Sequence, residues 1–385
     1  MPDGTDTQTL RVHSALADIP AEQWDACAGD NNPFVSHAFL SALEDSGSVQ
    51  PKSGWGPCHL TVENERGEIT ACAPLYLKGH SYGEYVFDWS WADAYQRGGQ
   101  SYYPKLLCAV PFTPATGPRL LTRPDTSPNT VALLAAGMVK LAEQQDCSSI
   151  HANFLPQDQQ EALQERGFLP RVDIQYHWDN RGYGSFDDFL QDLSSRKRKA
   201  IRKERRQVAE TDLDIRALSG PAIEPGHWDA FHQFYLSTSD KKWGSAYLNR
   251  DFWSLLGERL ADKVVLIMAF RDDQPVAGAL NLQGRDCLFG RNWGCLEEVK
   301  FLHFELCYYR AIDYAIDHGL SRVEAGAQGS HKIQRGYLPN LTRSAHWIAD
   351  RRFHDAVSQH LHHENRAMRD HLSELSNSSP YKKRK

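Results

Sequence analysis

The two halves of this 385-residue chain carry similar successions of apolar segments, and this repetition limits the possible folds more than any other feature. In each half, spacings typical of strands and of amphipathic helices alternate over segments of ordinary length. The chain is also longer than the size at which a single hydrophobic core usually stops growing. We therefore expect two mixed α/β lobes.

Apolar spacing places the individual elements along the chain. In the first half we expect helices at 21–27, 36–46, 130–145 and 158–166 and strands at 58–64, 68–77, 85–91 and 149–154. In the second half we expect helices at 228–239, 251–261, 301–317 and 353–372 and strands at 264–271, 274–282, 285–293 and 322–325. The domain prediction that follows is a lobe at 1–180, a connector at 181–212, a second lobe at 213–372 and a disordered polar tail at 373–385.

A strongly basic helix is expected at 185–210, between the lobes. Its apolar residues fall on one helical stripe, while arginines and lysines occupy the other faces. Positive surface of this kind can bind the phosphates of a tRNA without reading its sequence, although a solvated helix is the simpler interpretation. The candidate tRNA contacts are Arg196, Arg198, Arg202 and Arg205.

Composition excludes several classes of protein. The net charge of −6 argues against binding nucleic acid or membranes over the whole surface. The eight cysteines occur singly and form no C-x-x-C pair, which favours reduced thiols over disulfides or a zinc site. His303 and Cys307 have the spacing of a metal pair, but no matching ligands accompany them, so no metal is expected. Without a signal-like start or a long apolar run, a cytoplasmic protein is the expectation.

Several long phrases resemble the FemAB-like branch of the GNAT acyltransferase superfamily. They include YVFDWSWADAY, YYPKLLCAVPFTPATGPRLL, SSRKRKAIRKERRQV, LHFELCYYRAIDYAIDHGL, EAGAQGSHKIQRGYLP and SAHWI, and the resemblance extends from about Pro33 to about Leu361. It implies two tandem GNAT-like lobes facing each other across a cleft. It also implies acyl or aminoacyl transfer to an amine, with acyl-CoA or aminoacyl-tRNA as the donor and no bound cofactor. Peptidoglycan biosynthesis or recognition is the process linked to such proteins.

The resemblance also directs attention to glycine turns, because GNAT enzymes hold the CoA pyrophosphate on backbone N–H groups at the start of a helix. The corresponding segment is 291–296, where Arg291, Trp293 and Gly294 are candidate donor-binding residues and Leu296 stands in place of a small residue. In the first half, 96–101 comes nearer to the pattern. Both turns can equally be simple connections between a strand and a helix.

Three residues are candidates for proton transfer. Glu305 is the only carboxylate on an otherwise apolar helical stripe, where burial would raise its pKa toward that of a useful base; the alternative is a core glutamate tied to Arg or Tyr. Glu324 ends a short strand, where ligands gather in open α/β sheets, and the resemblance makes it the first choice for amine binding or base catalysis. His331 lies in the following loop and titrates near neutral pH.

Charged and aromatic residues supply candidate binding groups. Lys332 and Arg335, beside His331, can clamp a phosphate or carboxylate, although such charges are more often solvated. In the first half, Asp88, Trp91 and Tyr103 can enclose a cationic amine, and Lys105 can bind an acidic group; core packing is the alternative.

An N-acyltransferase is the leading functional hypothesis. The alternative is a GNAT-fold module that binds a peptidoglycan precursor or amino compound without converting it, since neither glycine turn matches well. A third hypothesis is an RNA-associated protein that docks through the basic helix.

Overall fold

The computed structural model describes residues 8–127, 129–242, 246–326 and 329–382. The chain forms two compact units, Met1–Asp173 with Thr342–Arg369 and Ile174–Leu341 with Asp370–Lys385. This division differs from the linear one expected from the sequence: residues 342–369 belong to the first unit, and the basic connector belongs to the second.

The return of the chain to the first unit has a simple cause in strand pairing. Strand β15 (Leu338–Ile348) runs antiparallel to β8 (Ser149–Asn153), with Ser344 opposite Asn153 and Ile348 opposite Ser149. Helix α12 (Arg351–Asn377) then packs Val357 and Leu361 into a buried aromatic cluster around Tyr95 and Tyr102. Hydrogen bonds and apolar burial together fix this segment against the first half of the chain.

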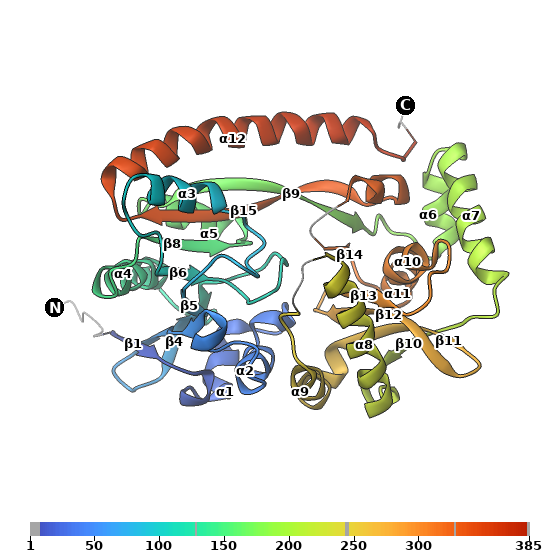
Figure 1. The fold of residues 1–385 in the computed structure, drawn as a ribbon, viewed down its shortest axis with the longest axis horizontal. Helices are drawn as coiled ribbons and strands as arrows, with labels where there is room; N and C mark the ends of the chain where they lie inside the picture. Colours follow the sequence, from blue (N-terminus) through green and yellow to red (C-terminus); the bar gives the residue numbers. More distant parts are fainter. Residues whose placement is uncertain (1–7, 128, 243–245, 327–328, 383–385) are drawn as a thin grey trace. The chain divides into compact units, whose positions relative to one another are not determined.

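The first unit contains a small antiparallel sheet and a second group of strands (Figure 1). The small sheet has the order β1-β3-β4-β7, formed by β1 (Thr9–His13), β3 (His59–Glu63), β4 (Ile69–Ala73) and β7 (Leu121–Thr122). The second group has the order β2-β5-β6-β8, formed by β2 (Trp55–Pro57), β5 (Leu75–Lys78), β6 (Lys105–Cys108) and β8. Its strands are antiparallel except for β6 and β8, which are parallel.

The helices of the first unit cover these strands. They are α1 (Ala21–Ala28), α2 (His37–Asp45), α3 (Trp89–Arg97), α4 (Asn129–Gln144) and α5 (Gln157–Gln164). Helix α4 supplies Leu134, Met138 and Leu141 to the main core, at the spacing that puts them on one helical face. The predicted strand at 85–91 is wrong: Trp91 and Tyr95, the buried residues of α3, lie four apart, which is helical spacing.

The second unit repeats the same pattern of antiparallel strands followed by one parallel pair. Its strands have the order β10-β11-β12-β13-β14-β9, and only β13 and β14 are parallel. The strands are β9 (Leu169–Asp179), of which residues 174–179 lie in this unit, β10 (Asp214–Ser219), β11 (Val264–Arg271), β12 (Gln274–Gln283), β13 (Cys287–Cys295) and β14 (Arg322–Glu324).

The helices of the second unit pack closely on these strands. They are α6 (Phe186–Asp192), α7 (Ser195–Ala209), α8 (Pro225–Lys242), α9 (Arg250–Leu260), α10 (Leu302–Phe304), the π-helix η6 (Glu305–Tyr309) and α11 (Arg310–Asp317). A Cβ atom on Gly278 of β12 would lie 3.1 Å from the ring of Phe231 on α8, so glycine permits this close packing.

The connector and the tail both differ from expectation. The connector forms two helices, because Leu193 is extended and pairs with Tyr381 in an isolated β-bridge. Residues 373–377 continue α12, and the Tyr381 hydroxyl donates to the Gly336 carbonyl oxygen at 2.8 Å. The tail is thus folded onto the second unit up to residue 382, while residues 383–385 lie outside the described part.

Within the described residues, no helix has both the length and the apolar character needed to cross a bilayer.

Candidate functional site

The divergence of the parallel strands β13 and β14 forms the candidate site of the second unit. The two strands pair only from Cys287 opposite Arg322 to Phe289 opposite Glu324, after which β13 continues and β14 ends. Beyond this point β13 carries a bulge, with Arg291 and Asn292 opposite a single residue of β12. The carboxyl end of β14 therefore lies beside the bulged part of β13, where the two parallel strands separate, and α/β proteins bind ligands at such places.

A small pocket of about 80 Å³ lies at this divergence. It is lined by the bulged part of β13 and by the helical segment that begins at Leu302. Its polar and aromatic lining consists of Asn281, Arg291, Asn292, Trp293, His303, Cys307 and Tyr308. Two residues proposed from the sequence as donor-binding groups, Arg291 and Trp293, thus line a real pocket.

Glu324 lies at the end of β14 and is buried, with 5% of its surface exposed. Its cross-strand neighbour is His177 of β9, and His177 Nε2 lies 3.9 Å from Glu324 Oε1. Burial lowers the pKa of His177 to about 3, so the ring is neutral at physiological pH. The Asn340 side-chain amide lies 3.2 Å from His177 Nδ1, on the other side of the ring from Glu324.

His177 was missed by the sequence reasoning because β9 was not predicted. The signal was present, since Val172, Ile174, Tyr176 and Trp178 alternate with polar residues, as expected of a half-buried strand. That alternation puts His177 on the face opposite Trp178.

His331 belongs to a second group of contacts. It lies in the 3-10 helix η7 (Ser330–Arg335), is exposed, and its Nε2 lies 3.0 Å from the Tyr308 hydroxyl. Burial raises the pKa of Tyr308, which keeps that hydroxyl protonated. Tyr308 lines the pocket, so His331 is connected to the pocket through it.

Lys332 and Arg335 do not present their charges to a ligand as the sequence suggested. Lys332 is buried and donates to the carbonyl oxygens of Ala325 and Gly326 at 2.6 and 2.9 Å. Arg335 forms a salt bridge with Glu204 of α7 at 2.9 Å and lies over the Phe304 ring. Both side chains are engaged in holding the loop after β14, since buried cations need acceptors of their own.

Glu305 has the contacts of a core glutamate tied to arginine, which was the alternative to a catalytic base. Its Oε1 accepts from Arg205 Nη2 at 3.1 Å and from Arg310 Nε at 3.0 Å. Burial raises the pKa of Glu305, while the two arginines oppose that shift. The predicted α-helical stripe is also interrupted, because Glu305 begins the π-helix. The Arg205 and Arg310 contacts match the core alternative, and a role for Glu305 as the base stays a prediction.

Neither glycine segment is a phosphate turn. Gly294 lies inside β13, opposite Gly278, and a Cβ on it would lie 2.0 Å from the Phe234 carbonyl oxygen. In the first unit, Gly98 and Gly99 follow the end of α3, where helical carbonyl groups face outward and disfavour an anion. The strand pairing around Gly294 was not visible in the local sequence.

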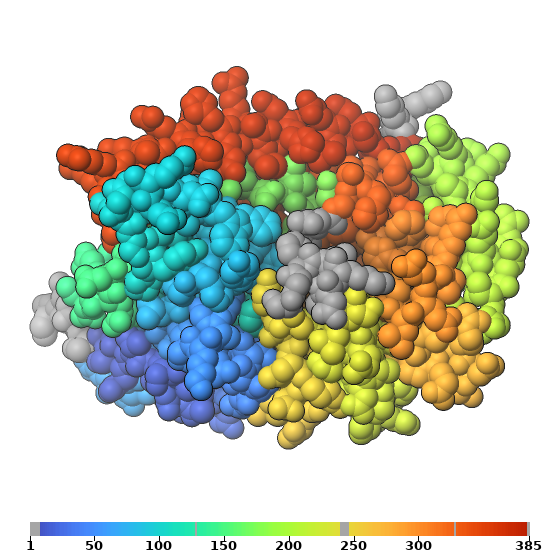
Figure 2. Space-filling view, viewed as in Figure 1, coloured from blue at the N-terminus to red at the C-terminus, as the bar shows by residue number. Residues whose placement is uncertain are grey.

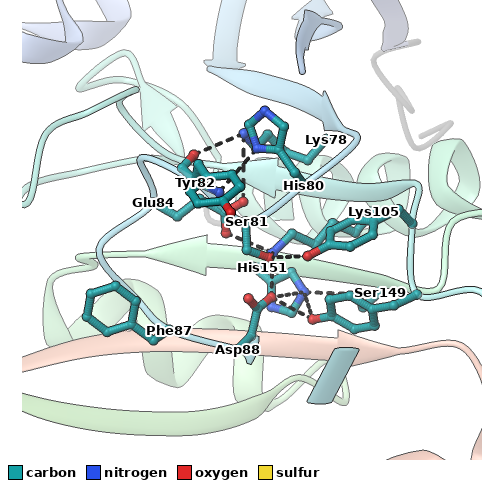
Figure 3. Close-up of polar contacts among 12 residues, drawn as sticks. Lys78, His80, Ser81, Tyr82, Glu84, Phe87, Asp88, Lys105, Ser149 and His151 are labelled. Carbon is teal, nitrogen blue, oxygen red and sulfur yellow. Dashed lines mark hydrogen bonds and ion pairs between the residues drawn. The ribbon is translucent and has the colours of Figure 1, made fainter. Parts of the chain in front are cut away.

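The proposed residues of the first unit do come together, but in a buried network (Figure 3). Lys105 Nζ donates to Ser81 Oγ and Glu84 Oε2, both at 2.8 Å, and to Asp88 Oδ2. Tyr103 joins the network through Ser81, at 2.8 Å. In this conformation Lys105 is fully buried and already has its counterions.

Trp91 lies apart from Lys105, in the core of the first unit. It is buried, with its ring centroid 5.1 Å from that of His346 in an edge-on arrangement. This is the packing alternative considered for it.

The basic surface of α7 faces solvent in part (Figure 2, light green). Arg196 and Arg202 are exposed, Arg198 is half-buried, and Arg202 forms an exposed salt bridge with Asp187 at 2.9 Å. Arg205 turns inward to Glu305 and Asp313, so it is not a surface contact as expected.

No group of three or more His, Cys, Asp or Glu side chains in the described part of the chain is arranged to hold a metal ion.

We compared the chain with known protein families and with curated proteins. A family model named FemAB-like and described as peptidoglycan biosynthesis/recognition matches residues 15–383. None of the curated proteins compared with the chain matches it.

Solved structures resemble the chain at low sequence identity. The crystal structure of FemX has a TM-score of 0.55 at 10% identity and covers 91% of this chain and 100% of its own. The C-terminal domain of a putative lysylphosphatidylglycerol synthetase from Agrobacterium fabrum has a TM-score of 0.55 at 8% identity, over 89% of this chain and 96% of its own. L-PGS from Bacillus licheniformis has a TM-score of 0.52 at 8% identity, over 90% and 99%. The expected mixed α/β fold is confirmed.

Proposed function

The chain belongs to the FemAB-like family, and from this premise we propose that it is an N-acyltransferase. It moves an acyl or aminoacyl group from acyl-CoA or aminoacyl-tRNA to an amine of a small molecule or peptidoglycan precursor. The observation that supports this best is the buried Glu324 at the point where β13 and β14 diverge, beside the pocket. A cleft shared by the two units stays a prediction.

Glu324 is the proposed base. Its carboxylate takes the proton that the acceptor amine loses on attack, and His177 Nε2 faces this carboxylate from β9. The nitrogen of the neutral amine attacks the donor carbonyl carbon and gives up this one proton as it does so; a C–N bond forms, and the C–S or C–O bond to the donor breaks.

Tyr308 is the proposed acid. Its hydroxyl gives its proton to the departing ribose oxygen of an aminoacyl-tRNA, and His331 restores that proton from solvent; a thiolate departing from acyl-CoA needs no such acid. The backbone near Gly294 is given no oxyanion role, because it lies in the strand ladder.

The donor is undecided between CoA and tRNA, and the turn after β13 bears on it. Residues 296–301 contain no glycine but two glutamates, Glu297 and Glu298, and Phe301 adopts a left-handed conformation before α10. Such a turn is poorly suited to cradle a pyrophosphate. This favours aminoacyl-tRNA, and it also keeps open the alternative of a binding module without turnover.

The experiment is an incubation of the protein with acyl-CoA mixtures and with charged tRNAs, in the presence of candidate amines, followed by mass analysis. A mass gain on an amine that depends on one donor class supports transfer and names the donor. Tight binding of an amine with no mass gain from either donor class contradicts the enzyme and favours the binding module.

His331→Ala is expected to lower kcat about fivefold, with KM nearly unchanged. The variant loses the hydrogen bond to Tyr308, worth about 1 kcal/mol, while Tyr308 itself remains. Steady-state kinetics with the donor found above measures the effect, and His354→Ala on α12 is the control. Equal kcat in both variants would remove His331 from the mechanism.

Arg196→Ala, Arg198→Ala and Arg202→Ala combined are expected to flatten the salt dependence of tRNA binding. Each lost phosphate contact lowers the slope of log K against log salt by about 0.7 to 0.9. The matched control removes three exposed arginines of α12, namely Arg352, Arg366 and Arg369. Identical slopes for the two triple variants would exclude α7 as the tRNA surface.

A further inference from the structure

We propose that Lys78 and Lys105 form a latent anion-binding site in the first unit. In this structure the carboxylate of Glu84 occupies it; a ligand bearing a phosphate or carboxylate group occupies it when the loop 79–88 opens. The site is independent of the residues assigned to transfer above.

The two lysines are placed as a pair by the strands. Lys78 on β5 lies directly opposite Lys105 on β6, and both side chains are fully buried. Like charges at directly opposed positions of a strand pair repel each other. Replacing such buried charges by apolar groups is often neutral or favourable for stability, so packing alone gives no reason for two adjacent ammonium groups.

The counterions come from a loop rather than from the strands. Residues 79–88 form neither helix nor strand between β5 and α3, and they carry Ser81, Glu84 and Asp88 inward (Figure 3). All three contact Lys105. Movement of this one segment would therefore remove the three partners of Lys105 together and leave the two ammonium groups without these counterions.

The ammonium group of Lys78 has only long contacts with the oxygen atoms of this loop. Its Nζ lies 3.4 Å from the Tyr82 carbonyl oxygen and 3.8 Å from Glu84 Oε1, in addition to a cation–π contact with Trp55. Glu84 Oε1 and Asp88 Oδ1 are buried and have no hydrogen-bond partner among the described residues. Burial lowers the pKa of Lys78 to about 7 and raises that of Glu84 to about 7. An oxyanion that reached both lysines would satisfy Lys78 better than Glu84 does.

The outer side of the same loop, together with Trp89 at the start of α3, is suited to the rest of such a ligand. Tyr82, Phe87 and Trp89 are 56%, 45% and 39% exposed, and they are three of the five large apolar side chains exposed in the described part of the chain. The rings of Tyr82 and Trp89 lie 4.9 Å apart, and Phe87 points away from Lys105 (Figure 3). Exposed aromatic faces bind planar or sugar-like groups. The ligand class is therefore an acidic compound with a ring.

The test titrates pyrophosphate and succinate separately into the protein by calorimetry at pH 7 and low salt. Glu84→Gln removes the internal carboxylate and is expected to tighten the binding of at least one of these anions tenfold or more over the wild type. The anion whose affinity increases more shows whether the site prefers phosphate or carboxylate. Glu165→Gln, an exposed glutamate of the same unit, is the control and is expected to leave both affinities unchanged.

Adding Lys78→Met to Glu84→Gln is expected to abolish the gain in anion affinity. The proposal is overturned if Glu84→Gln binds neither anion more tightly than the wild type, or if the gain survives loss of Lys78. Should Glu84→Gln not fold, hydrogen exchange of the wild type decides: millimolar pyrophosphate or succinate is expected to speed exchange in residues 79–88, and no change with either anion overturns the proposal.

Discussion

Glu324→Gln is expected to lower kcat by about a thousandfold, within the range that a positioned acid–base group contributes to catalysis. Glutamine keeps the size of the side chain but cannot take a proton from the acceptor amine. The buried position at the end of β14 and the neutral His177 beside it are retained. Single-turnover kinetics with the donor and amine identified by mass analysis measures the chemical step without product release.

Glu258→Gln, an exposed glutamate of α9 in the same unit, is the matched control and is expected to keep full activity. Circular dichroism establishes that both variants are folded. A folded Glu324→Gln protein with wild-type kcat would show that Glu324 is not the base. A change in KM alone would make it a binding residue instead.

Lys105→Met is expected to lower the free energy of unfolding by about 3 to 5 kcal/mol, as measured for buried ion pairs that lose one partner. The variant leaves Glu84 and Asp88 buried without their principal cation. Burial opposes the charge of Asp88, yet Lys105 and His151 hold its pKa well below the usual range. Urea unfolding followed by fluorescence gives the difference.

The loss of unfolding free energy in Lys105→Met is expected to be larger at pH 8 than at pH 5. Without Lys105, the folded-state pKa values of both carboxyls rise above their unfolded values, so the folded state binds extra protons and its stability falls as pH rises. Adding Asp88→Asn removes one unpaired carboxylate and is expected to recover part of the loss. A Lys105→Met protein as stable as the wild type at both pH values would contradict the buried ion network.

Local sequence was sufficient for the element that carries the site. A strand was predicted at 322–325, and its acid, Glu324, is found at the divergence of two parallel strands. Neighbours across the sheet were invisible in the same pattern. His177 is 147 positions away in sequence, and it faces Glu324 only because β9 and β14 pair in one register.

The sequence identified the charged residues of this region, but it did not reveal which groups they contact in the folded protein. Lys332 and Arg335 looked like ligand clamps, and both hold the protein's own oxygens instead. Gly294 looked like part of a turn, and it lies in a strand because β12 pairs with it. Glu305 lay on the expected apolar face, yet Arg205 reaches it from α7, about a hundred positions earlier in the chain.

What the sequence determined by itself was the kind of most segments, the mixed α/β class, and the strand end at which Glu324 lies. These follow from local periodicity and from the family phrases, which need no knowledge of distant contacts. Only the tertiary structure decided which ionisable groups are neutralised and which remain for chemistry. The reason is that the cost of a buried charge depends on partners brought together by folding, and the order of residues along the chain does not record them.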